Sequence, residues 1–267
     1  MKVISKGGHA MQPRERQQQL LKQLAQQQQM SVADVMTALT VSRDTARRDI
    51  VAVTEQGLAQ RIHGGVQVLN FAVDIPSYQD RLRQFSQLKT ALAKLVLPTI
   101  QPGQYVFLDV ATTLLKLTQL ITQKCTIYTH SLDNAISLAT NPAVTVELLG
   151  GTLNQKNRFF GGPTTLEAVQ TVAFDQVIVG AATVTANGLF YSDRDDAAVK
   201  RQALSQTTQG ILVCEHRKFG QAARYCGGQL TQIQLVITDE PLTHTEQRWF
   251  PKTTEFRHLT EDDYDQH

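Results

Sequence analysis

Three arginines stand at the start of a segment that the sequence predicts to be a short helix. They are Arg43, Arg47 and Arg48, in the stretch S-R-D-T-A-R-R-D that begins at Ser42. A guanidinium group carries forked N–H donors that match phosphate oxygens and the major-groove edge of guanine. Cations in the first turns are unfavourable for the helix macrodipole, so a negatively charged partner explains their placement better than helix stability does.

Two short helices are expected to position these arginines. Ser31 and Ser42 are predicted N-caps, and the hydroxyl of Ser42 is placed to accept the amide hydrogen of Thr45. Apolar residues recur at helical spacing in both segments, at Val32, Val35, Met36 and Leu39 in the first and at Ala46, Ile50 and Val53 in the second. The pattern indicates a helix-turn-helix whose second helix contacts the major groove of DNA. A helical hairpin with a solvated basic face is the alternative.

The segment after these helices is typical of a wing. Gly57 is a predicted helix stop, residues 59–62 and 66–69 are predicted strands, and Gly64 and Gly65 supply a permissive turn between them. Residues 1–69 carry nine Lys+Arg against five Asp+Glu, whereas the net charge of the whole chain is +2. The predicted helix-turn-helix therefore lies in the basic part of the chain, which supports contact with phosphate groups.

The string T-A-R-R-D-I, followed by G-L-A-Q-R-I-H-G-G-V, resembles the signature of DeoR-type bacterial transcription regulators, and the resemblance runs from about Met11 to the end. It implies a winged helix-turn-helix followed by a sugar-phosphate-sensing domain. It also implies a repressor, or less often an activator, of sugar or nucleoside catabolism genes, with double-stranded operator DNA and a phosphorylated sugar as partners. The residues expected at the DNA are Ser31, Ser42, Arg43, Asp44, Thr45, Arg47, Arg48, Arg61, His63 and Gly64.

Length and composition indicate a globular protein of two domains. The chain has 267 residues, 42% of them hydrophobic. Its three cysteines, Cys125, Cys214 and Cys226, have no spacing typical of a disulfide framework or a metal site, and no cofactor is expected. The sequence contains no segment expected to span a membrane and no signal-peptide pattern, which predicts a cytoplasmic protein. The expected domains are a disordered extension (1–10), the winged helix-turn-helix (11–69), a connector and the start of a linking helix (70–84), and the effector domain (85–267). A helix is expected from Arg14, and the glutamine-rich stretches beside it are alternatively a linker.

The second domain alternates strands and helices. Strands are predicted at 105–109, 125–129, 144–149, 176–180, 211–214 and 235–238, and helices at 78–97, 112–122, 131–140, 163–172 and 194–206. This alternation favours an α/β fold, a mostly parallel sheet with helices on both faces. By resemblance, the fold is that of sugar-phosphate isomerases and CoA transferases.

Ligands of such sheets bind beyond the carboxyl ends of the strands, so the turns there hold the candidate effector-binding residues. These residues are Asp109, Thr112, Thr113 and His130, to which the resemblance adds Lys200, at a position the family usually keeps basic, and Lys218, in a segment that resembles the family's D-x-S-K-F-G. Plainer roles are open for several of them: Thr112 as a helix cap, His130 as a hydrogen-bonded structural residue, and Lys218 as a solvated loop lysine.

Departures from the resemblance leave two alternative functions open. Val110 and Ala111 stand where relatives commonly have serine and glycine, and Thr183 stands at another usual glycine. If the relatives' glycine has a positive φ, alanine at position 111 costs about 1 to 2 kcal/mol, and its methyl group crowds a ligand that approaches the backbone. One alternative is therefore a DNA-binding protein with a decayed pocket. The other is an isomerase or deaminase with an attached DNA-binding module, for which carboxylates are available at Asp109, Asp193, Asp195, Asp196 and Glu215. We expect a regulator that is not an enzyme and that forms a homo-oligomer, a dimer or a tetramer.

Overall fold

The computed structural model describes residues 11–68, 77–221 and 223–263, and the chain divides into two compact units, Met1–Asn70 and Phe71–His267. The predicted extension 1–10, Leu69 of the predicted wing and residues 70–76 of the predicted connector lie outside the described residues. Among the described helices, none combines the length and the hydropathy needed to cross a membrane.

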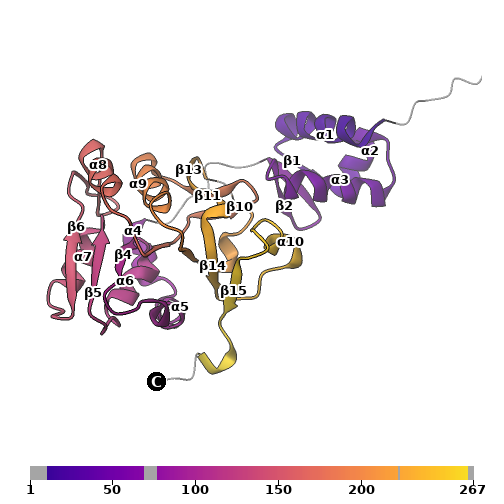
Figure 1. Ribbon diagram of the computed structural model, residues 1–267. Coiled ribbons are helices and arrows are strands. Elements are labelled where there is room, and N and C mark those ends of the chain that lie inside the picture. The colour runs from indigo at the N-terminus through magenta and orange to yellow at the C-terminus, as the bar shows by residue number, and fades with distance from the viewer. Residues whose placement is uncertain (1–10, 69–76, 222, 264–267) are drawn as a thin grey trace, which may run out of the picture. The chain divides into compact units, whose positions relative to one another are not determined.

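The N-terminal unit consists of three helices and a small antiparallel sheet (Figure 1). Its elements are α1 (Pro13–Gln27), β1 (Gln29–Ser31), α2 (Val32–Leu39), α3 (Arg43–Glu55), β2 (Ala59–Ile62) and β3 (Gly65–Val68). One core joins the helices, in which Leu20 and Leu24 of α1 pack with Val35 of α2 and with Ile50 and Val53 of α3. The amphipathic pattern in the sequence is therefore realised, and it leaves the arginine-bearing side of α3 in solvent.

Both predicted N-caps are confirmed. The hydroxyl of Ser31 accepts the amide hydrogen of Asp34, and that of Ser42 accepts the amide hydrogen of Thr45. Between the two helices Thr40 has a φ of 54°, the left-handed conformation that ends α2 and turns the chain into α3. The sequence pattern thus located both the start of the second helix and the turn before it.

The wing differs from its prediction in two details. β3 begins at Gly65, so the turn consists of His63 and Gly64, and Gly64 alone has the positive φ, 81°. Gly65 is needed for close approach, because a Cβ there would collide with the backbone oxygen of Met30. The third strand, β1, was not predicted; it pairs with β3 and places part of the glutamine-rich stretch in the sheet.

The C-terminal unit is built on a seven-stranded parallel sheet with the strand order β15-β14-β12-β9-β4-β5-β6. Its strands are β4 (Tyr105–Leu108), β5 (Cys125–Thr129), β6 (Val144–Leu148), β9 (Gln176–Val179), β12 (Gly210–Val213), β14 (Ile233–Thr238) and β15 (Glu255–His258). Two smaller antiparallel sheets consist of β7 (Thr152–Asn154) with β8 (Phe159–Gly161), and of β10 (Thr183–Thr185), β11 (Gly188–Tyr191) and β13 (Tyr225–Gly228).

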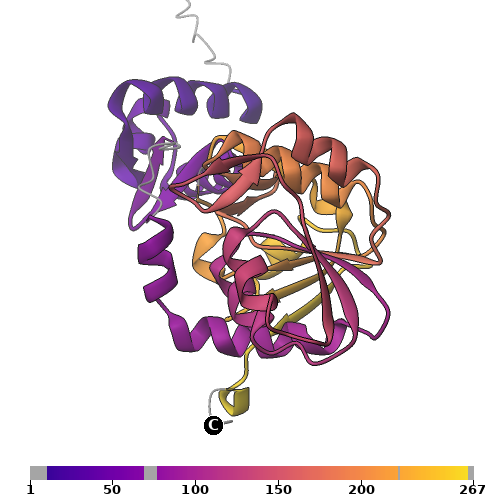
Figure 2. The ribbon, with the colours of Figure 1, turned by 90° about the vertical axis from the view of Figure 1, so that its left-hand side faces the viewer.

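Helices cover both faces of the large sheet (Figures 1 and 2). The helices of this unit are α4 (Tyr78–Arg83), α5 (Ser86–Val96), α6 (Thr112–Thr118), α7 (Leu132–Leu138), α8 (Pro163–Gln170), α9 (Arg194–Leu204) and α10 (His244–Gln247). Side chains alternate along the strands: Val106 and Leu108 enter the core with α5 and α6, whereas Phe107 enters the core with α8 and α9. The predicted α/β class is confirmed.

Several predicted boundaries are wrong. The helix expected over 78–97 is two helices, α4 and α5, because the chain turns at Gln84 and Phe85, and Phe85 has a φ of 55°. The helix expected over 112–122 ends at Thr118. The edge strand β15 and the two small sheets were not predicted, since their strands have three or four residues and carry too short a pattern.

Candidate DNA-binding surface and effector cavity

The exposed side of α3 carries the arginines on which the DNA-binding prediction rests. Arg43, Asp44, Arg47 and Arg48 are exposed, whereas Ala46, Asp49 and Ile50 on the opposite side are buried. Within the described residues none of the three arginines forms an ion pair. Their guanidinium groups are therefore available to an external anion.

A partly buried ion pair fixes α3 against α1. The Arg16 guanidinium contacts both carboxylate oxygens of Asp49, at 2.7 Å from Nε and 3.0 Å from Nη2, and Asp49 is only 2% exposed. The hydrogen bond to Asp49 is the main reason that the pKa of Arg16 is raised. This two-point contact holds the helix in place while its other face remains in solvent.

The other residues predicted to contact DNA lie at the start of α3, at the start of α2 and on the wing. Ser42 and Thr45 lie in the first turn of α3, with their hydroxyl oxygens 3.0 Å apart. Ser31 is exposed, and its hydroxyl donates to the Asp34 carboxylate while it caps α2. Arg61, His63 and Gly64 are exposed on the wing, with His63 and Gly64 at its tip.

A cavity of about 430 Å³ lies in the C-terminal unit, at the carboxyl ends of β4, β9 and β12. The chain segments around it include the turn after β4, the start of α9, the loop after β12 and the corner between α4 and α5. Its polar and charged lining residues include Arg81, Lys89, Thr112, Thr113, Asn157, Asp193, Asp196, Lys200, Glu215, Arg217 and Lys218. The cavity therefore stands where the topology of a parallel sheet places ligands.

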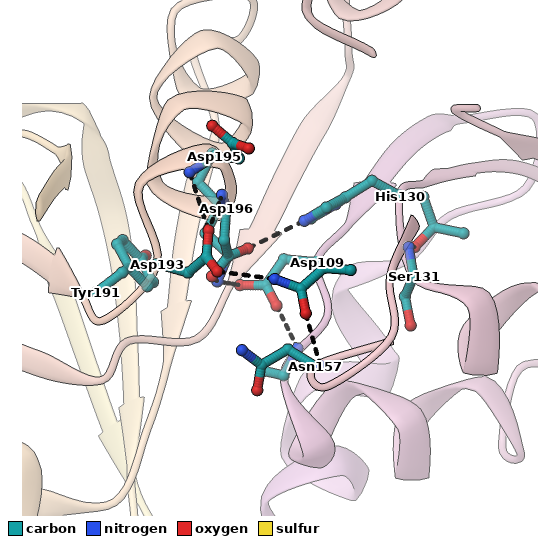
Figure 3. Close-up of polar contacts among 12 residues, drawn as sticks. Asp109, His130, Ser131, Asn157, Tyr191, Asp193, Asp195 and Asp196 are labelled. Carbon is teal, nitrogen blue, oxygen red and sulfur yellow. Dashed lines mark hydrogen bonds and ion pairs between the residues drawn. The ribbon is translucent and has the colours of Figure 1, made fainter. Parts of the chain in front are cut away.

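The floor of the cavity is a buried charge network around Lys200 of α9 (Figure 3 shows the carboxylates and His130). The Lys200 ammonium lies 2.9 Å from Asp196 and 3.2 Å from Asp109, and it stands over the Tyr191 ring at 4.0 Å. Burial alone would raise the pKa of Asp196, but Lys200 and the hydrogen bond from His130 outweigh it, and the pKa falls to about 2. One cation thus offsets two buried carboxylates.

Asp109 lies beneath the cavity lining with its carboxylate fully engaged. Its oxygens accept the backbone amides of Ala111 and Gly180 in addition to the ion pair with Lys200. Asn134 donates to the backbone carbonyl of Asp109, which fixes the turn after β4. Asp109 therefore orients the cavity wall, while Thr112 and Thr113 form part of that wall.

The structure does not place His130 on the cavity wall. Its ring is fully buried between Phe107 and Phe159, and Nε2 lies 3.0 Å from Asp196. His130 therefore takes the plainer of its two predicted roles, a hydrogen-bonded structural residue. It supports the carboxylate that pairs with Lys200.

The two non-glycine positions are accommodated without backbone strain. Ala111 has a φ of −65°, so the cost expected for alanine at a positive φ does not apply. Its methyl group faces Gly180, where an added Cβ would lie 2.6 Å from it. Thr183 is buried, lies outside the cavity lining, and donates to the backbone carbonyl of Lys218 at 2.9 Å. Thr183 therefore helps to position the loop that carries Lys218.

Cations predominate near the loop after β12 and the α4–α5 corner. Glu215 pairs with Arg217 and lies 3.8 Å from Lys218. Burial by itself would raise the pKa of Glu215, but the two cations have the larger effect, and the pKa is lowered overall. Burial is the main cause that lowers the pKa of Lys89 to about 8, and it also lowers that of Arg81. This part of the cavity therefore favours an anionic ligand.

Sequence reasoning missed Arg81, Lys89 and Arg217 as cavity residues, and it named Asp196 only as a carboxylate available to the enzyme alternative. Asp196 lies four residues before Lys200 on α9, so the spacing of the two offered a signal for an ion pair. Arg81 and Lys89 offered none, because the expected continuous helix over 78–97 hides the corner that brings them to the cavity. Among the described residues, no group of histidine, cysteine and carboxylate side chains could hold a metal ion.

Comparisons with known proteins agree along both units. A family model described as the DeoR-like helix-turn-helix domain matches residues 16–71, and one described as the DeoR C terminal sensor domain matches residues 84–240. The HTH-type transcriptional repressor GlcR of Bacillus subtilis (strain 168) is 32% identical over 217 residues, which are 81% of this chain and 84% of the relative. The glycerol-3-phosphate regulon repressor of Escherichia coli (strain K12) is 27% identical over 83% of this chain and 89% of its own length. Ribose 5-phosphate isomerase A from Neisseria gonorrhoeae aligns with 51% of this chain and 54% of its own, at 13% identity and a TM-score of 0.36.

Proposed function

The chain belongs to the DeoR family of DNA-binding transcriptional regulators and is not an enzyme, and from this premise we propose that it represses genes of sugar catabolism or transport. A phosphorylated sugar that binds the cavity of the C-terminal unit is the proposed effector. In this proposal operator DNA is bound while the cavity is empty and is released when the sugar phosphate binds. Relatives named as a transcriptional repressor and as a glycerol-3-phosphate regulon repressor support repression.

One observation carries the effector proposal: the cavity combines surplus cations with hydroxyl and carboxylate groups. Arg81, Lys89, Arg217 and Lys218 offer donors to a phosphate group, with Glu215 the one carboxylate paired among them. Thr112 and Thr113 supply hydroxyl groups at the end of β4, the kind of partner that sugar hydroxyls require. A volume of about 430 Å³ suits a small ligand of this kind.

The proposed DNA contacts lie on α3 and the wing. Arg43, Arg47 and Arg48 are proposed to contact base edges or phosphates in the major groove, and Arg61 and His63 the backbone or the minor groove. Operators with two-fold half-sites favour an even number of subunits, so the proposal includes a homodimer or a tetramer.

A pull-down of genomic fragments with the purified chain, followed by footprinting, tests the DNA side. Arg48→Ala is expected to abolish the footprint without lowering the melting temperature, because Arg48 is exposed and unpaired among the described residues. Arg14→Ala removes an exposed cation from α1 and serves as the matched control, with only a small effect on affinity. An unchanged footprint with Arg48→Ala would remove this residue from the interface.

A thermal-shift screen with phosphorylated sugars tests the effector side. A ligand at 100 times its dissociation constant is expected to stabilise the protein by about 2.7 kcal/mol. The ligand that stabilises the protein is then added to the footprinting reaction, where release of the operator is expected. If no phosphorylated sugar stabilises the protein or releases DNA, the effector proposal is wrong and the decayed-pocket alternative takes its place.

A further inference from the structure

The corner between α4 and α5 forms one wall of the cavity. Lys89 of α5 extends its ammonium group back to the end of α4, where it donates to the backbone carbonyls of Arg81 and Gln84. Phe85, between the two helices, has the left-handed backbone conformation, and the Arg217 guanidinium covers its ring at 4.6 Å. The end of α4 is thus held in the cavity wall by contacts with α5 and with the loop after β12.

Arg81 is the cavity cation with the least satisfied side chain. Its Nε atom is buried and has no hydrogen-bond partner within the described part of the chain. Its Nη2 atom reaches the Asn157 side-chain oxygen only at 3.5 Å, the outer limit of a hydrogen bond. A buried donor of a charged group without an acceptor is unfavourable, and an entering anion supplies the missing acceptor.

The carboxylates of the cavity are already engaged elsewhere. Asp196 pairs with Lys200, Glu215 pairs with Arg217 and Lys218, and Asp193 caps α9 by accepting two backbone amides. Among the described residues, Arg81 and Lys89 have no carboxylate within 4 Å. Carboxylates act on these two cations only at longer range, so both can form a direct ion pair with an entering anion.

We propose that the anionic group of the effector binds Arg81, with Lys89 beside it, so that ligand binding acts directly on α4. This inference rests on the proposed function and adds the residue that recognises the charge. α4 is the first described element after the wing strand β3 along the chain. A ligand that bridges Arg81 and the loop after β12 ties α4 to that loop, while Lys89 continues to hold the end of α4 through the carbonyls of Arg81 and Gln84. The state of this helix then depends on whether the cavity is occupied.

The test uses the full-length chain and three variants. Arg81→Gln removes the charge, Arg81→Lys keeps the charge but removes Nε, and Arg83→Gln is the control, an exposed cation on the same helix outside the cavity lining. The probes are inorganic phosphate, glycerol 3-phosphate, ribose 5-phosphate and glucose 6-phosphate, each sugar phosphate paired with its uncharged parent. Calorimetry measures affinity, and hydrogen exchange measures protection of the amides of residues 77–83.

The expected result is a loss of selectivity for the charged group. Arg81→Gln lowers the affinity for the phosphorylated probe at least tenfold and leaves the affinity for the uncharged parent unchanged. Arg81→Lys shows a smaller loss of affinity for the phosphorylated probe, and Arg83→Gln binds both as the wild type does. The probe protects α4 in the wild type and not in Arg81→Gln. If Arg81→Gln fails to fold, the same comparison is made with Arg81→Lys.

Two results would overturn the inference while leaving the proposed function intact: Arg81 variants that bind the phosphorylated probe as the wild type does, or an equal loss for phosphorylated and parent probes. A wild type that binds none of the probes contradicts the proposed function itself, and the inference with it.

Discussion

Replacement of Lys200 by methionine tests the charge network beneath the cavity. Methionine keeps most of the unbranched stem and removes the ammonium that lies 2.9 Å from Asp196 and 3.2 Å from Asp109. The side chain of Asp109 is fully buried and that of Asp196 is 11% exposed, so water from the cavity compensates for the lost cation only in part. Two carboxylates are then left in a buried site with the hydrogen bonds of backbone amides and of His130.

The expected loss of stability is several kcal/mol. Lys200 and His130 bring the pKa of Asp196 down to about 2 against the effect of burial, which corresponds to a contribution on the order of 2 to 3 kcal/mol. Removing one partner of a buried ion pair typically costs about 3 to 5 kcal/mol. We therefore expect Lys200→Met to destabilise the C-terminal unit by about 3 kcal/mol, or roughly 10 °C in melting temperature.

The pH dependence separates this effect from a packing defect. In the wild type the depressed pKa of Asp196 contributes stability fully above its unfolded value of about 4, and that stability is lost as the pH falls toward 2. Without Lys200, burial raises the pKa of Asp196, and protonation relieves the charge as the pH falls. The stability difference between wild type and variant is therefore expected to narrow between pH 7 and pH 4.

Urea unfolding of the full-length chain at several pH values measures this difference. Arg201→Met is the matched control, because Arg201 follows on the same helix, is exposed and donates to the Cys226 carbonyl at 2.9 Å. The control is expected to lose less than about 1 kcal/mol at every pH. A Lys200→Met variant that loses no more than the control, or a difference that does not change with pH, would refute the reasoning.

Three further predictions concern stability. Asp49→Ala leaves Arg16 without its two-point partner and is expected to lower the unfolding free energy of the N-terminal unit by about 2 to 3 kcal/mol in urea, and a loss below 1 would contradict it. Thr40→Gly relieves the left-handed φ of 54° and is expected to raise that free energy by about 1 kcal/mol, whereas destabilisation would argue against strain there. Gly180→Ala places a methyl 2.6 Å from the Ala111 Cβ and is expected to lower the melting temperature, and Ala111→Gly in the same chain should restore it. Additive effects of the two changes would show that the methyl groups do not meet.

The DNA-binding unit was predictable to a large extent because its structure is local. The caps at Ser31 and Ser42 and the apolar spacing of Ala46, Ile50 and Val53 each depend on residues within a few positions of one another. β1 was missed because its three residues acquire strand structure only by pairing with β3, more than thirty residues later. Asp49 offered no sign of its partner, since Arg16 lies on another helix.

The cavity was predictable only in part because its residues meet through tertiary structure. The rule that ligands bind at the carboxyl ends of parallel strands located Thr112 and Thr113, and the family resemblance located Lys200 and Lys218; all four line the cavity. It failed for His130, which the fold encloses between two aromatic rings. The rule also says nothing of residues outside the sheet turns, and the α4–α5 corner is such a place.

Two of the cavity lysines, Lys200 and Lys89, have opposite surroundings, and this difference distinguishes a residue that stabilises the fold from one that helps to bind the ligand. Lys200 contacts two carboxylates, so its charge is offset before any ligand arrives, and its removal is expected to act mainly on stability. Lys89 donates to neutral carbonyls beside Arg81, whose Nε has no partner among the described residues, so these two residues interact with the nearby carboxylates only at longer range and can pair directly with an entering anion. A change at Lys200 should therefore alter the unfolding free energy with or without ligand. A change at Arg81 should alter the stability of the free protein less than ligand selectivity, because its guanidinium lies over the Tyr78 ring at 5.5 Å but has no carboxylate within 4 Å among the described residues.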